Sequence, residues 1–356
     1  MPDDLLLVTG GAGFIGSAVV RAALGAGWRV RVLDSGRPDV HGAPLRAGAL
    51  PDGVELVVGD VRDADLLDAA LSGVSAVSHQ AAKVGMGLDL QDAPDYAGTN
   101  VTGTAELVAA MARAGVGRLV LASSMVVYGE GAYRRPGDGL PARPAARTEA
   151  DLAAGRFDPR DAETGELLEP GVVTEDAALD PRSTYALTKL AQEHLVSVWA
   201  RETGGRAAAL RYHNVYGPGM PRDTPYAGVA AIFRSALERG EPPLVFEDGA
   251  QRRDLVHVDD VAAAGVAALT WTAGAPAGTS RAFNTGSGAV TTVLQLATAL
   301  SEALGGPEPV VTGRYRAGDV RHVTASSERA AAELGWRAAV RAAEGLADFA
   351  RAPLRA

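Results

Sequence analysis

The sequence predicts an α/β protein with a doubly wound parallel sheet and a smaller C-terminal α/β lobe. Short apolar runs typical of buried strands alternate with stretches of helical pattern through the first 211 residues, which is the order of a parallel sheet with crossover helices. A glycine-rich turn joins the first apolar run to the first helical stretch. The chain of 356 residues, 47% hydrophobic and 22% charged, is long enough to bury a large core.

The expected elements follow one another in a regular order. We expect strands at residues 5–8, 30–33, 54–58, 76–79, 119–122 and 207–211, because each run is short and apolar. We expect helices at 17–24, 65–71, 104–114 and 228–238. The regular order stops at residues 129–181, where prolines, glycines and charges cluster, and we interpret this stretch as a long surface insertion with little regular structure.

Composition and charge exclude several classes of function. The net charge is −9, with 43 acidic against 34 basic residues, so no broad basic surface is available to bind nucleic acid or an anionic membrane. The chain has no cysteine, which excludes disulfides, thiolate metal ligands and cysteine nucleophiles. The six histidines show no metal-ligand spacing, so no metal is expected, and His213 and His257 are interpreted as satisfied, partly buried histidines. With no signal peptide or membrane-spanning run, we expect a cytoplasmic protein.

Three glycines in the first turn indicate a dinucleotide site. Gly10, Gly13 and Gly16 stand between the first strand and the first helix, where glycine permits a tight turn and lets a pyrophosphate approach the helix N-terminus. Asp34 ends the second strand, where a carboxylate accepts hydrogen bonds from the adenosine ribose and repels a 2′-phosphate, so NAD is favoured over NADP. The alternative is a glycine-rich turn in a glycine-rich chain.

Four further residues are assigned to this cofactor site. Phe14 and Ile15 stand between the second and third glycines. Asp60 and Val61 follow the third expected strand, where a short polar side chain can meet the adenine. Asp60 is explained equally well as the N-cap of the next helix.

Tyr185 and Lys189 form the candidate acid–base pair. They are four residues apart at the start of an expected helix capped by Ser183, so their side chains share one face. We expect the Lys189 ammonium to stabilise the Tyr185 phenolate and move the phenol pKa toward neutrality, so that the tyrosine can take a proton from an alcohol. Ser124 ends another strand and could relay this proton, although a serine there also serves as a cap. The chain has only two lysines, Lys83 and Lys189, which makes each of them informative.

With these motifs together, the sequence resembles an extended short-chain dehydrogenase/reductase of the nucleotide-sugar epimerase and dehydratase group. The stretches that carry the resemblance span nearly the whole chain: TGGAGFIGS, HQAAKVG, NVTGT, SSMVVYG, YALTK, RYHNVYGPG, RRDLVHVDDV and YRAGDVRH. We therefore expect a Rossmann-like NAD-binding domain over residues 1–212, with 255–285 returning to it. A nucleotide-sugar-binding lobe is expected over 213–254 and 286–356.

Carried over residue by residue, the resemblance implies three sets of side chains. NAD would be held by Gly10, Gly13, Gly16, Asp34 and Asp60, with Ala81, Ala82, Lys83 and Asn100 along its nicotinamide half. The catalytic triad would be Ser124, Tyr185 and Lys189, of which the last two also contact the cofactor. The nucleotide diphosphate of the substrate would be held by Asn214, Arg253, Arg316 and Asp319, with Lys83, Ser124 and Met125 also in the substrate site.

The resemblance also narrows the reaction. Group members that eliminate water carry an Asp-Glu pair directly after the serine or threonine of the triad, and decarboxylases carry a glutamate at the second place, but here these places hold Met125 and Val126. The 3,5-epimerases of the group need a cysteine, which this chain lacks. A 4-epimerisation through a transient 4-keto sugar needs only the triad and NAD, and it is the reaction that we expect.

Similarity to particular branches of the group indicates the substrate sugar. The resemblance is greatest to the dTDP-L-rhamnose 4-epimerases, both in the insertion after Gly129 and in five stretches: 214–219, 225–229, 232–233, 245–249 and 252–254. Residues 81–85 are similar to the UDP-glucuronate 4-epimerases, so a UDP-hexose or UDP-hexuronate stays open as substrate.

Two other functions stay open. An NAD(P)H-dependent reductase of nucleotide 4-keto sugars would use the same triad, and Asp34 argues only mildly against it. A non-catalytic NAD-binding regulator would keep the fold without the chemistry, which the intact triad disfavours. The resemblance further implies a homodimer that packs helices near residues 99–114 and 185–201, with a nucleotide-diphosphate sugar as the small-molecule partner.

Overall fold

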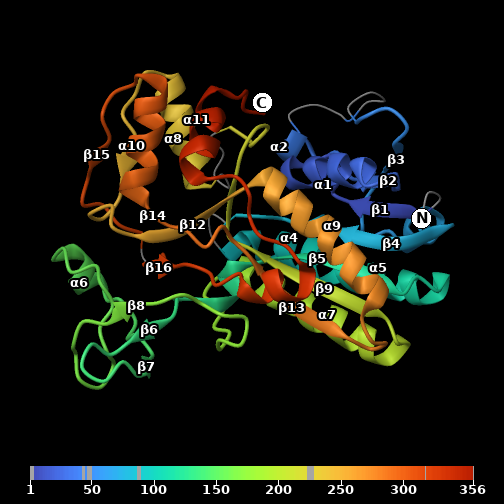
Figure 1. Ribbon diagram of the computed structural model, residues 1–356, viewed down its shortest axis with the longest axis horizontal. Helices are drawn as coiled ribbons and strands as arrows, with labels where there is room; N and C mark the ends of the chain where they lie inside the picture. The colour runs from blue at the N-terminus through green and yellow to red at the C-terminus, as the bar shows by residue number, and fades with distance from the viewer. Residues whose placement is uncertain are drawn as a thin grey trace.

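A seven-stranded parallel sheet, in the order β13-β9-β5-β4-β1-β2-β3, is the frame of the molecule (Figure 1). Its strands are β1 (Leu5–Thr9), β2 (Arg29–Asp34), β3 (Glu55–Val58), β4 (Val74–His79), β5 (Arg118–Ser124), β9 (Arg206–Tyr212) and β13 (Ser280–Thr285). The computed structural model describes residues 4–41, 45, 50–85, 90–222, 228–316 and 318–355. All six expected strands are present, and the strand order reverses beside β1, which confirms the doubly wound α/β fold.

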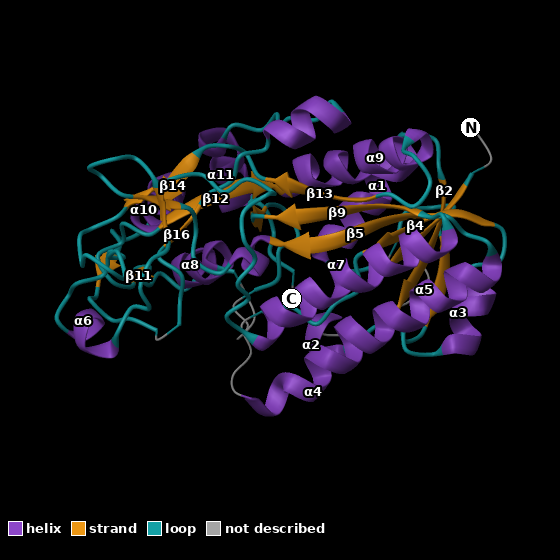
Figure 2. Cartoon of the chain, turned by 90° about the horizontal axis from the view of Figure 1, so that it is seen from below, coloured by secondary structure: helices purple, strands orange, loops and turns teal. Residues whose placement is uncertain are grey.

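Helices cover both faces of this sheet (Figure 2). The helices α1 (Phe14–Gly25) and α9 (Val258–Gly274) lie on one face, and α3 (Ala64–Ala70), α5 (Gly103–Ala114) and α7 (Thr184–Thr203) lie on the other. Alternate residues of β1 serve the two faces, because Leu6 and Val8 pack with α1 and α9 while Leu5 and Leu7 pack with the other three. A strand that is buried on both faces is apolar throughout, which is why the sequence showed continuous apolar runs.

The helical segment around α5 begins earlier than the sequence suggests. A short turn η1 (Leu90–Asp92), the helix α4 (Ala93–Tyr96) and a π-helical turn η2 (Ala97–Thr102) precede it without a break. Pro94, Gly98 and Gly103 interrupt the helical pattern in the sequence, and they hid this extension. The π-helical turn places Asn100 in the interior, with no exposed surface.

A second, smaller lobe is built around a four-stranded sheet. It contains β10 (Asn214–Tyr216), β12 (Arg252–His257), β14 (Val290–Thr292) and β16 (His322–Val323), and a separate pair is formed by β11 (Leu244–Val245) and β15 (Val310–Val311). Three helices share the core of this lobe, namely α8 (Val229–Glu238), α10 (Val293–Leu304) and α11 (Ala342–Arg351). The chain leaves the lobe after β12, runs through α9, and adds β13 to the edge of the large sheet. Outside the insertion at 129–181, the remaining short helical segments of the described chain are α2 (Pro38–His41), η3 (Met125–Tyr128) and η4 (Ala330–Leu334).

The insertion at 129–181 has little regular structure, as expected, but its few short elements form a small sheet and a helical turn. It forms a three-stranded antiparallel sheet of β6 (Tyr133–Arg134), β7 (Pro141–Ala142) and β8 (Glu169–Pro170), together with the helix α6 (Glu149–Ala153). Each strand has two residues, which is too short to show an alternating pattern in the sequence. Tyr133, Phe157 and Val173 are buried, so the segment is packed rather than loose.

No helix among the described residues is long and apolar enough to cross a membrane.

Candidate active site

A cavity of about 550 Å³ lies at the carboxyl ends of the strands of the large sheet. It brings together most of the residues that the sequence pointed to. The cavity is lined by Gly10, Gly13, Phe14, Ile15, Gly16, Asp34, Asp60, Val61, Ala81, Ala82, Lys83, Ser124, Met125, Tyr185, Lys189 and Asn214. Asn100, Arg253, Arg316 and Asp319 do not line it.

The glycine turn between β1 and α1 is packed so closely that side chains would not fit. Gly10 has φ +67°, and a Cβ there would lie 2.7 Å from the backbone nitrogen of Ala81. A Cβ on Gly16 would lie 2.8 Å from the carbonyl carbon of Gly10. Gly13 is the N-cap of α1 and offers no side-chain oxygen, so the first N–H groups of the helix are left for a ligand. This geometry fits the pyrophosphate of a dinucleotide.

Asp34 is held as a carboxylate at the end of β2. Its Oδ2 accepts the N–H of Ala12, and its Oδ1 accepts the N–H of Gly36 and faces Nε2 of His41. Each of these three distances is 3.0 Å. Burial disfavours the charge, but the hydrogen bonds from His41 and the backbone outweigh it and lower the pKa of Asp34. Asp34 is therefore ionised at neutral pH and can accept a further hydrogen bond from a ribose hydroxyl.

The end of the chain completes this part of the cavity, which sequence reasoning missed. Arg355 donates from Nη1 to the carbonyl of Ala12 at 2.6 Å and from Nη2 to Nδ1 of His41. Since arginine only donates, His41 accepts at Nδ1 and carries its proton on Nε2, which donates to Asp34. The backbone of Arg355 pairs with Met220 and Arg222, so the tail is tied to the second lobe. Arg355 belongs to no sequence motif, so only its contacts in the tertiary structure identify it.

Asp60 faces the cavity but does not cap α3. Its carboxylate binds its neighbour Arg62, at 2.9 Å from Nε and 2.6 Å from Nη2, and the hydrogen bond from Arg62 lowers the pKa of Asp60. The N-cap of α3 is Asp63, which accepts the N–H of Leu66. The alternative explanation of Asp60 as a helix cap was therefore wrong.

Asn100 supports the cavity from behind rather than lining it. Its Oδ1 accepts the N–H of Lys83 at 2.8 Å, and its Nδ2 donates to the carbonyl of Lys83 at 3.0 Å and to Oγ1 of Thr188 at 2.9 Å. It thereby joins the loop after β4 to the helix that carries Lys189. The Lys83 ammonium pairs with Asp95 at 3.2 Å, and the same carboxylate accepts two hydrogen bonds from Arg37.

Tyr185, Lys189 and Ser124 meet at the centre of the cavity. Ser183 caps α7 by accepting the N–H of Ala186, and the first turns of the helix then carry Tyr185 and Lys189 on one side. The Lys189 Nζ donates to the carbonyl of Ala122 at 2.9 Å and lies 5.9 Å from the centre of the Tyr185 ring. Ser124, at the end of β5, accepts the N–H of Val126 and so also caps η3.

The pKa values of this pair differ from the expectation. Burial raises the pKa of Tyr185 to about 12, and a contact with the Ser124 hydroxyl offsets only part of the rise. Burial lowers the pKa of Lys189 to about 7, against a smaller opposing effect of Glu193. The expected shift of the phenol toward neutrality is therefore absent, because the loss of hydration outweighs the hydrogen bond with Ser124. The group that titrates near pH 7 is the lysine.

The two histidines near the site behave differently. His257 caps α9, since its Nδ1 accepts the N–H of Asp259, so it is satisfied as expected. His213 lines the cavity, is 4% exposed, and makes no hydrogen bond to a described residue through either ring nitrogen. Burial lowers the pKa of His213 against the opposing effects of Asp254 and Asn284, so the histidine has polar neighbours but lacks the well-formed hydrogen bonds that were expected. Beside it, the buried Oδ1 of Asn214 also lacks a described partner and can receive a donor from a ligand.

The other predicted substrate residues gather in the second lobe. Arg253 donates to the carbonyls of Val320 at 2.8 Å and Arg321 at 2.9 Å. The guanidinium of Arg316 lies 5.4 Å from the centre of the Phe246 ring. Burial raises the pKa of Asp319 despite the nearby charges of Arg316 and Arg253. These three residues form a second cluster, in the second lobe and outside the cavity lining. Residues 225–227 of the expected substrate-branch stretch lie outside the described residues.

Comparison with known proteins gives consistent findings. The family model described as "NAD dependent epimerase/dehydratase family" matches residues 6–149 and 161–286. The chain is 40% identical to a dTDP-L-rhamnose 4-epimerase of Burkholderia thailandensis, over 93% of this chain and 90% of the relative. It is 35% identical to a UDP-glucose 4-epimerase of Mycolicibacterium smegmatis, with 96% of each chain covered.

Solved structures show the same similarity. A UDP-glucose 4-epimerase of Thermotoga maritima with UDP-glucose is 29% identical and superposes with a TM-score of 0.76, with 97% of each chain covered. A UDP-glucose 4-epimerase of Thermus thermophilus in complex with NAD is 31% identical, with a TM-score of 0.73 and 97% of each chain covered.

The close packing at Gly16 predicts the effect of one methyl group. Gly16→Ala forces the turn to shift, so we expect loss of NAD binding and a loss of about 1–3 kcal/mol in the free energy of unfolding. Gly25→Ala is the matched control, since it stands on the same helix with open space around it and should leave both properties unchanged. Bound NAD released by heat and chemical denaturation curves measure the two effects. Equal behaviour of the two variants would contradict the role of the turn.

The contact of the C-terminal tail predicts a second effect. Arg355→Met removes the hydrogen bonds to Ala12 and His41, and we expect NAD to bind about tenfold more weakly because charged hydrogen bonds contribute about 1.5–3 kcal/mol. Arg351→Met is the control, because Arg351 is exposed and contacts only the carbonyl of Ala347 in its own helix. Titration calorimetry of the NAD-free proteins gives both dissociation constants. An unchanged constant for Arg355→Met would exclude the tail from the cofactor site.

Proposed function

Since this chain belongs to the NAD dependent epimerase/dehydratase family and uses NAD as its cofactor, we propose that it inverts C4 of a nucleotide sugar, with dTDP-L-rhamnose and its C4 epimer as the substrate pair. The observation that carries the proposal is the single cavity in which Ser124, Tyr185 and Lys189 lie beside the glycine turn. Met125 and Val126 follow Ser124 and offer no group that could exchange a proton at a neighbouring carbon. The site therefore supports oxidation and reduction at one carbon and no elimination.

The residues of the cavity divide the work of the reaction. When bound, NAD supplies an acceptor for the C4 hydride and then a donor that returns it. Tyr185 takes the proton of the 4-hydroxyl as the transient 4-keto sugar forms and gives it back at the end. The Ser124 hydroxyl is placed to share this proton, and the unpaired Asn214 Oδ1 is placed to hold the sugar nucleotide while the sugar turns. Inversion follows when the opposite face of the keto sugar is reduced.

Lys189 decides when Tyr185 can act as a base. Only a pair that has lost one proton can accept another from the sugar, and the first proton leaves the group with the lower pKa. With a pKa of about 7 for Lys189 and about 12 for Tyr185, that group is the lysine. Once one proton is lost, the pair can exist as neutral lysine with phenol or as ammonium with phenolate, because the two states hold the same number of protons. Above neutral pH the pair can therefore accept the proton of the sugar hydroxyl.

The nucleotide is proposed to lie against the cluster in the second lobe. Arg253 and Arg316 carry fixed positive charge suited to a diphosphate, and Asp319 can accept from a ribose hydroxyl. The named activity of the 40% identical relative favours dTDP-L-rhamnose over UDP-hexoses, which are the substrates named for relatives at 35% identity and lower.

The function is tested by supplying nucleotide sugars without added cofactor. The purified protein is incubated with dTDP-L-rhamnose, UDP-glucose and UDP-glucuronate in turn, and the products are followed by NMR. We expect the C4 epimer of dTDP-L-rhamnose and no net NADH. Consumption of added NADPH by a 4-keto sugar would instead indicate a reductase, and binding of NAD with no turnover of any sugar would indicate a regulator.

Removal of one oxygen tests the base. Tyr185→Phe keeps the ring but removes the proton acceptor, and we expect the epimerisation rate to fall by about a thousandfold. Circular dichroism and the content of bound NAD should match those of the unaltered protein, because the phenyl ring preserves the packing. An unaltered rate would remove Tyr185 from the mechanism.

The pKa of Lys189 predicts the pH dependence. Below pH 7 the pair is fully protonated, so kcat/KM should rise about tenfold per pH unit from pH 5.5 and level off above about pH 7. In Lys189→Met the rise should continue to pH 9, since only the phenol with its pKa of about 12 is left to titrate. Initial rates across this range measure both profiles. A flat profile from pH 5.5 to 8 in the unaltered protein would contradict the assignment.

A further inference from the structure

The insertion at 129–181 is docked on the second lobe. Val173 donates its N–H to the carbonyl of Thr324 at 2.8 Å and its carbonyl accepts the N–H of Ser326 at 2.9 Å, so the two segments are joined by an isolated parallel β-bridge. Gly131 lies so close to β16 that a Cβ there would be 3.1 Å from the carbonyl carbon of His322. The insertion is therefore in a fixed place relative to the residues that follow β15.

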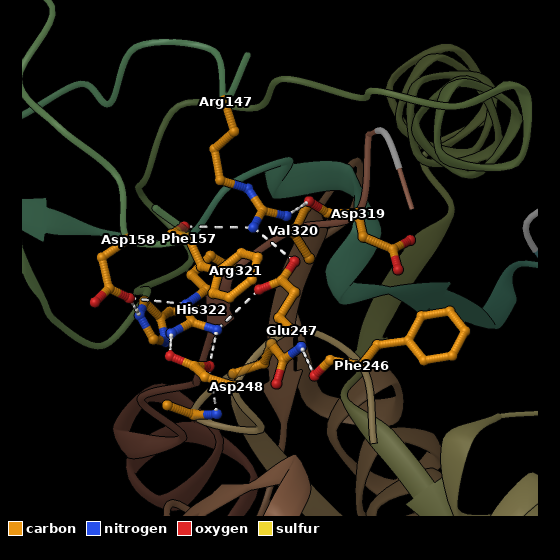
Figure 3. Close-up of polar contacts among 12 residues, drawn as sticks. Arg147, Phe157, Asp158, Phe246, Glu247, Asp248, Asp319, Val320, Arg321 and His322 are labelled. Atoms are coloured by element: carbon orange, nitrogen blue, oxygen red, sulfur yellow. Dashed lines mark hydrogen bonds and ion pairs between the residues drawn. The ribbon is translucent and has the colours of Figure 1, made fainter. Parts of the chain in front are cut away.

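Opposite charges meet at the interface between them (Figure 3). Glu130, Arg147, Glu247 and Arg321 are buried, whereas the side chains of Asp158 and Asp248 are 50% and 47% exposed. The insertion contributes Glu130, Arg147 and Asp158, and the second lobe contributes Glu247, Asp248 and Arg321. Arg321 has no exposed surface and donates to all three acids in its reach: Nε to Asp158 at 2.8 Å, Nη1 to Glu247 at 2.8 Å, and both Nη1 and Nη2 to Asp248 at 2.7 and 2.9 Å. Each charge in this interface is met by an opposite charge, as burial requires.

Arg147 is the member of this set that reaches toward the nucleotide cluster. Its side chain is 7% exposed, and its Nη1 donates to Oε1 of Glu247 at 2.7 Å. Its Nη2 donates to the main-chain carbonyl of Asp319 (Figure 3). A guanidinium is suited to this task because its rigid fork can hold two acceptors in fixed relative positions.

Two of the acceptors of Arg147, Glu247 and Asp319, hold the segment that carries Arg316. Glu247 donates its N–H to the carbonyl of Arg314 at 2.7 Å, and the Asp319 N–H donates to the carbonyl of Arg316 at 3.3 Å. Glu247 has φ +52°, a left-handed conformation that is costly for a residue with a side chain and that persists only where its surroundings hold it. Both of its carboxylate oxygens are held, one by Arg147 and the other by Arg321.

We propose that Arg147 is a positioning residue for substrate binding: the insertion uses it to hold Glu247 and Asp319, and thereby places Arg316 and Asp319 for the nucleotide diphosphate. This inference rests on the proposed function, since that function places the nucleotide at these residues. It gives the insertion a role in affinity for the nucleotide half of the substrate, at a distance from the C4 chemistry. Arg147 acts through the residues that it holds and leaves the proton transfer of Tyr185 unchanged.

The test separates binding from chemistry. In Arg147→Met we expect the dissociation constants of dTDP and UDP, measured by titration calorimetry on the NAD-loaded protein, to rise about tenfold for whichever nucleotide the unaltered protein binds. KM for the sugar nucleotide should rise by a similar factor, and kcat should stay within about twofold. Arg147→Lys keeps the charge but not the fork, so it should fall between the two proteins, and it replaces Arg147→Met if that variant does not fold.

Arg135→Met is the matched control within the insertion. Arg135 pairs with Asp161 at 3.0 Å and with Glu163, all inside the insertion, so its loss disturbs that segment without touching the second lobe. We expect no change in nucleotide affinity. An equal loss in Arg135→Met, or unchanged affinity in Arg147→Met or its lysine replacement, would overturn the positioning role alone. An unaltered protein that binds neither dTDP nor UDP and turns over no sugar nucleotide would overturn the proposed function as well.

Discussion

Burial of both faces of the large sheet is the constraint on which the rest of the structure depends. Leu6 and Val8 of β1 pack in the apolar core on one face of the sheet, and Leu5 and Leu7 pack in the core on the other face. A polar side chain in the middle of such a strand therefore needs a hydrogen-bond partner. The polar groups of the sheet are therefore found at strand ends or in closed networks. His79 shows the second solution, because its ring nitrogens meet Thr9 at 2.7 Å and Thr104 at 2.9 Å. The chemistry is left to the carboxyl edge, where the strands open into the cavity.

The same burial sets the acid–base properties of that edge. Burial removes hydration from Tyr185 and Lys189, so the neutral forms of both side chains are favoured. Tyr185 is a phenol in water and remains one here, whereas Lys189, an ammonium in water at neutral pH, has a pKa lowered to about 7. Near neutral pH the pair loses its first proton from Lys189. The Tyr185 hydroxyl can still be the group that contacts the sugar.

Charged hydrogen bonds join the peripheral segments to this core, in addition to the apolar packing of Val173 and Leu354. The C-terminal tail reaches the glycine turn through Arg355, and the insertion reaches the second lobe through Arg147 and Arg321. Buried guanidinium groups of this kind contribute specificity of arrangement more than stability, because desolvation offsets most of the attraction. Such contacts suit a two-lobed enzyme, in which each lobe holds a different part of a ligand and their relative placement matters more than the strength of their association.

The sequence by itself determined the sheet, the cofactor turn and the acid–base pair, because each depends on neighbours along the chain. Continuous apolar runs follow from burial on both faces, Gly16 avoids a clash with Gly10 in the same turn, and Tyr185 and Lys189 share a face through helix periodicity. The clash that Gly10 avoids is with Ala81 after β4, so that contact belongs to the tertiary structure. Only the tertiary structure decided what depends on residues far apart. The direction of the pKa shift of Tyr185 depends on the burial of its ring. Asp34 is bound by His41, which is bound in turn by Arg355, 321 positions after Asp34. The insertion is held by contacts with Glu247 and Arg321 of the second lobe. Hydration, pairing and packing at such sites are properties of the whole fold, and a local pattern carries no record of them.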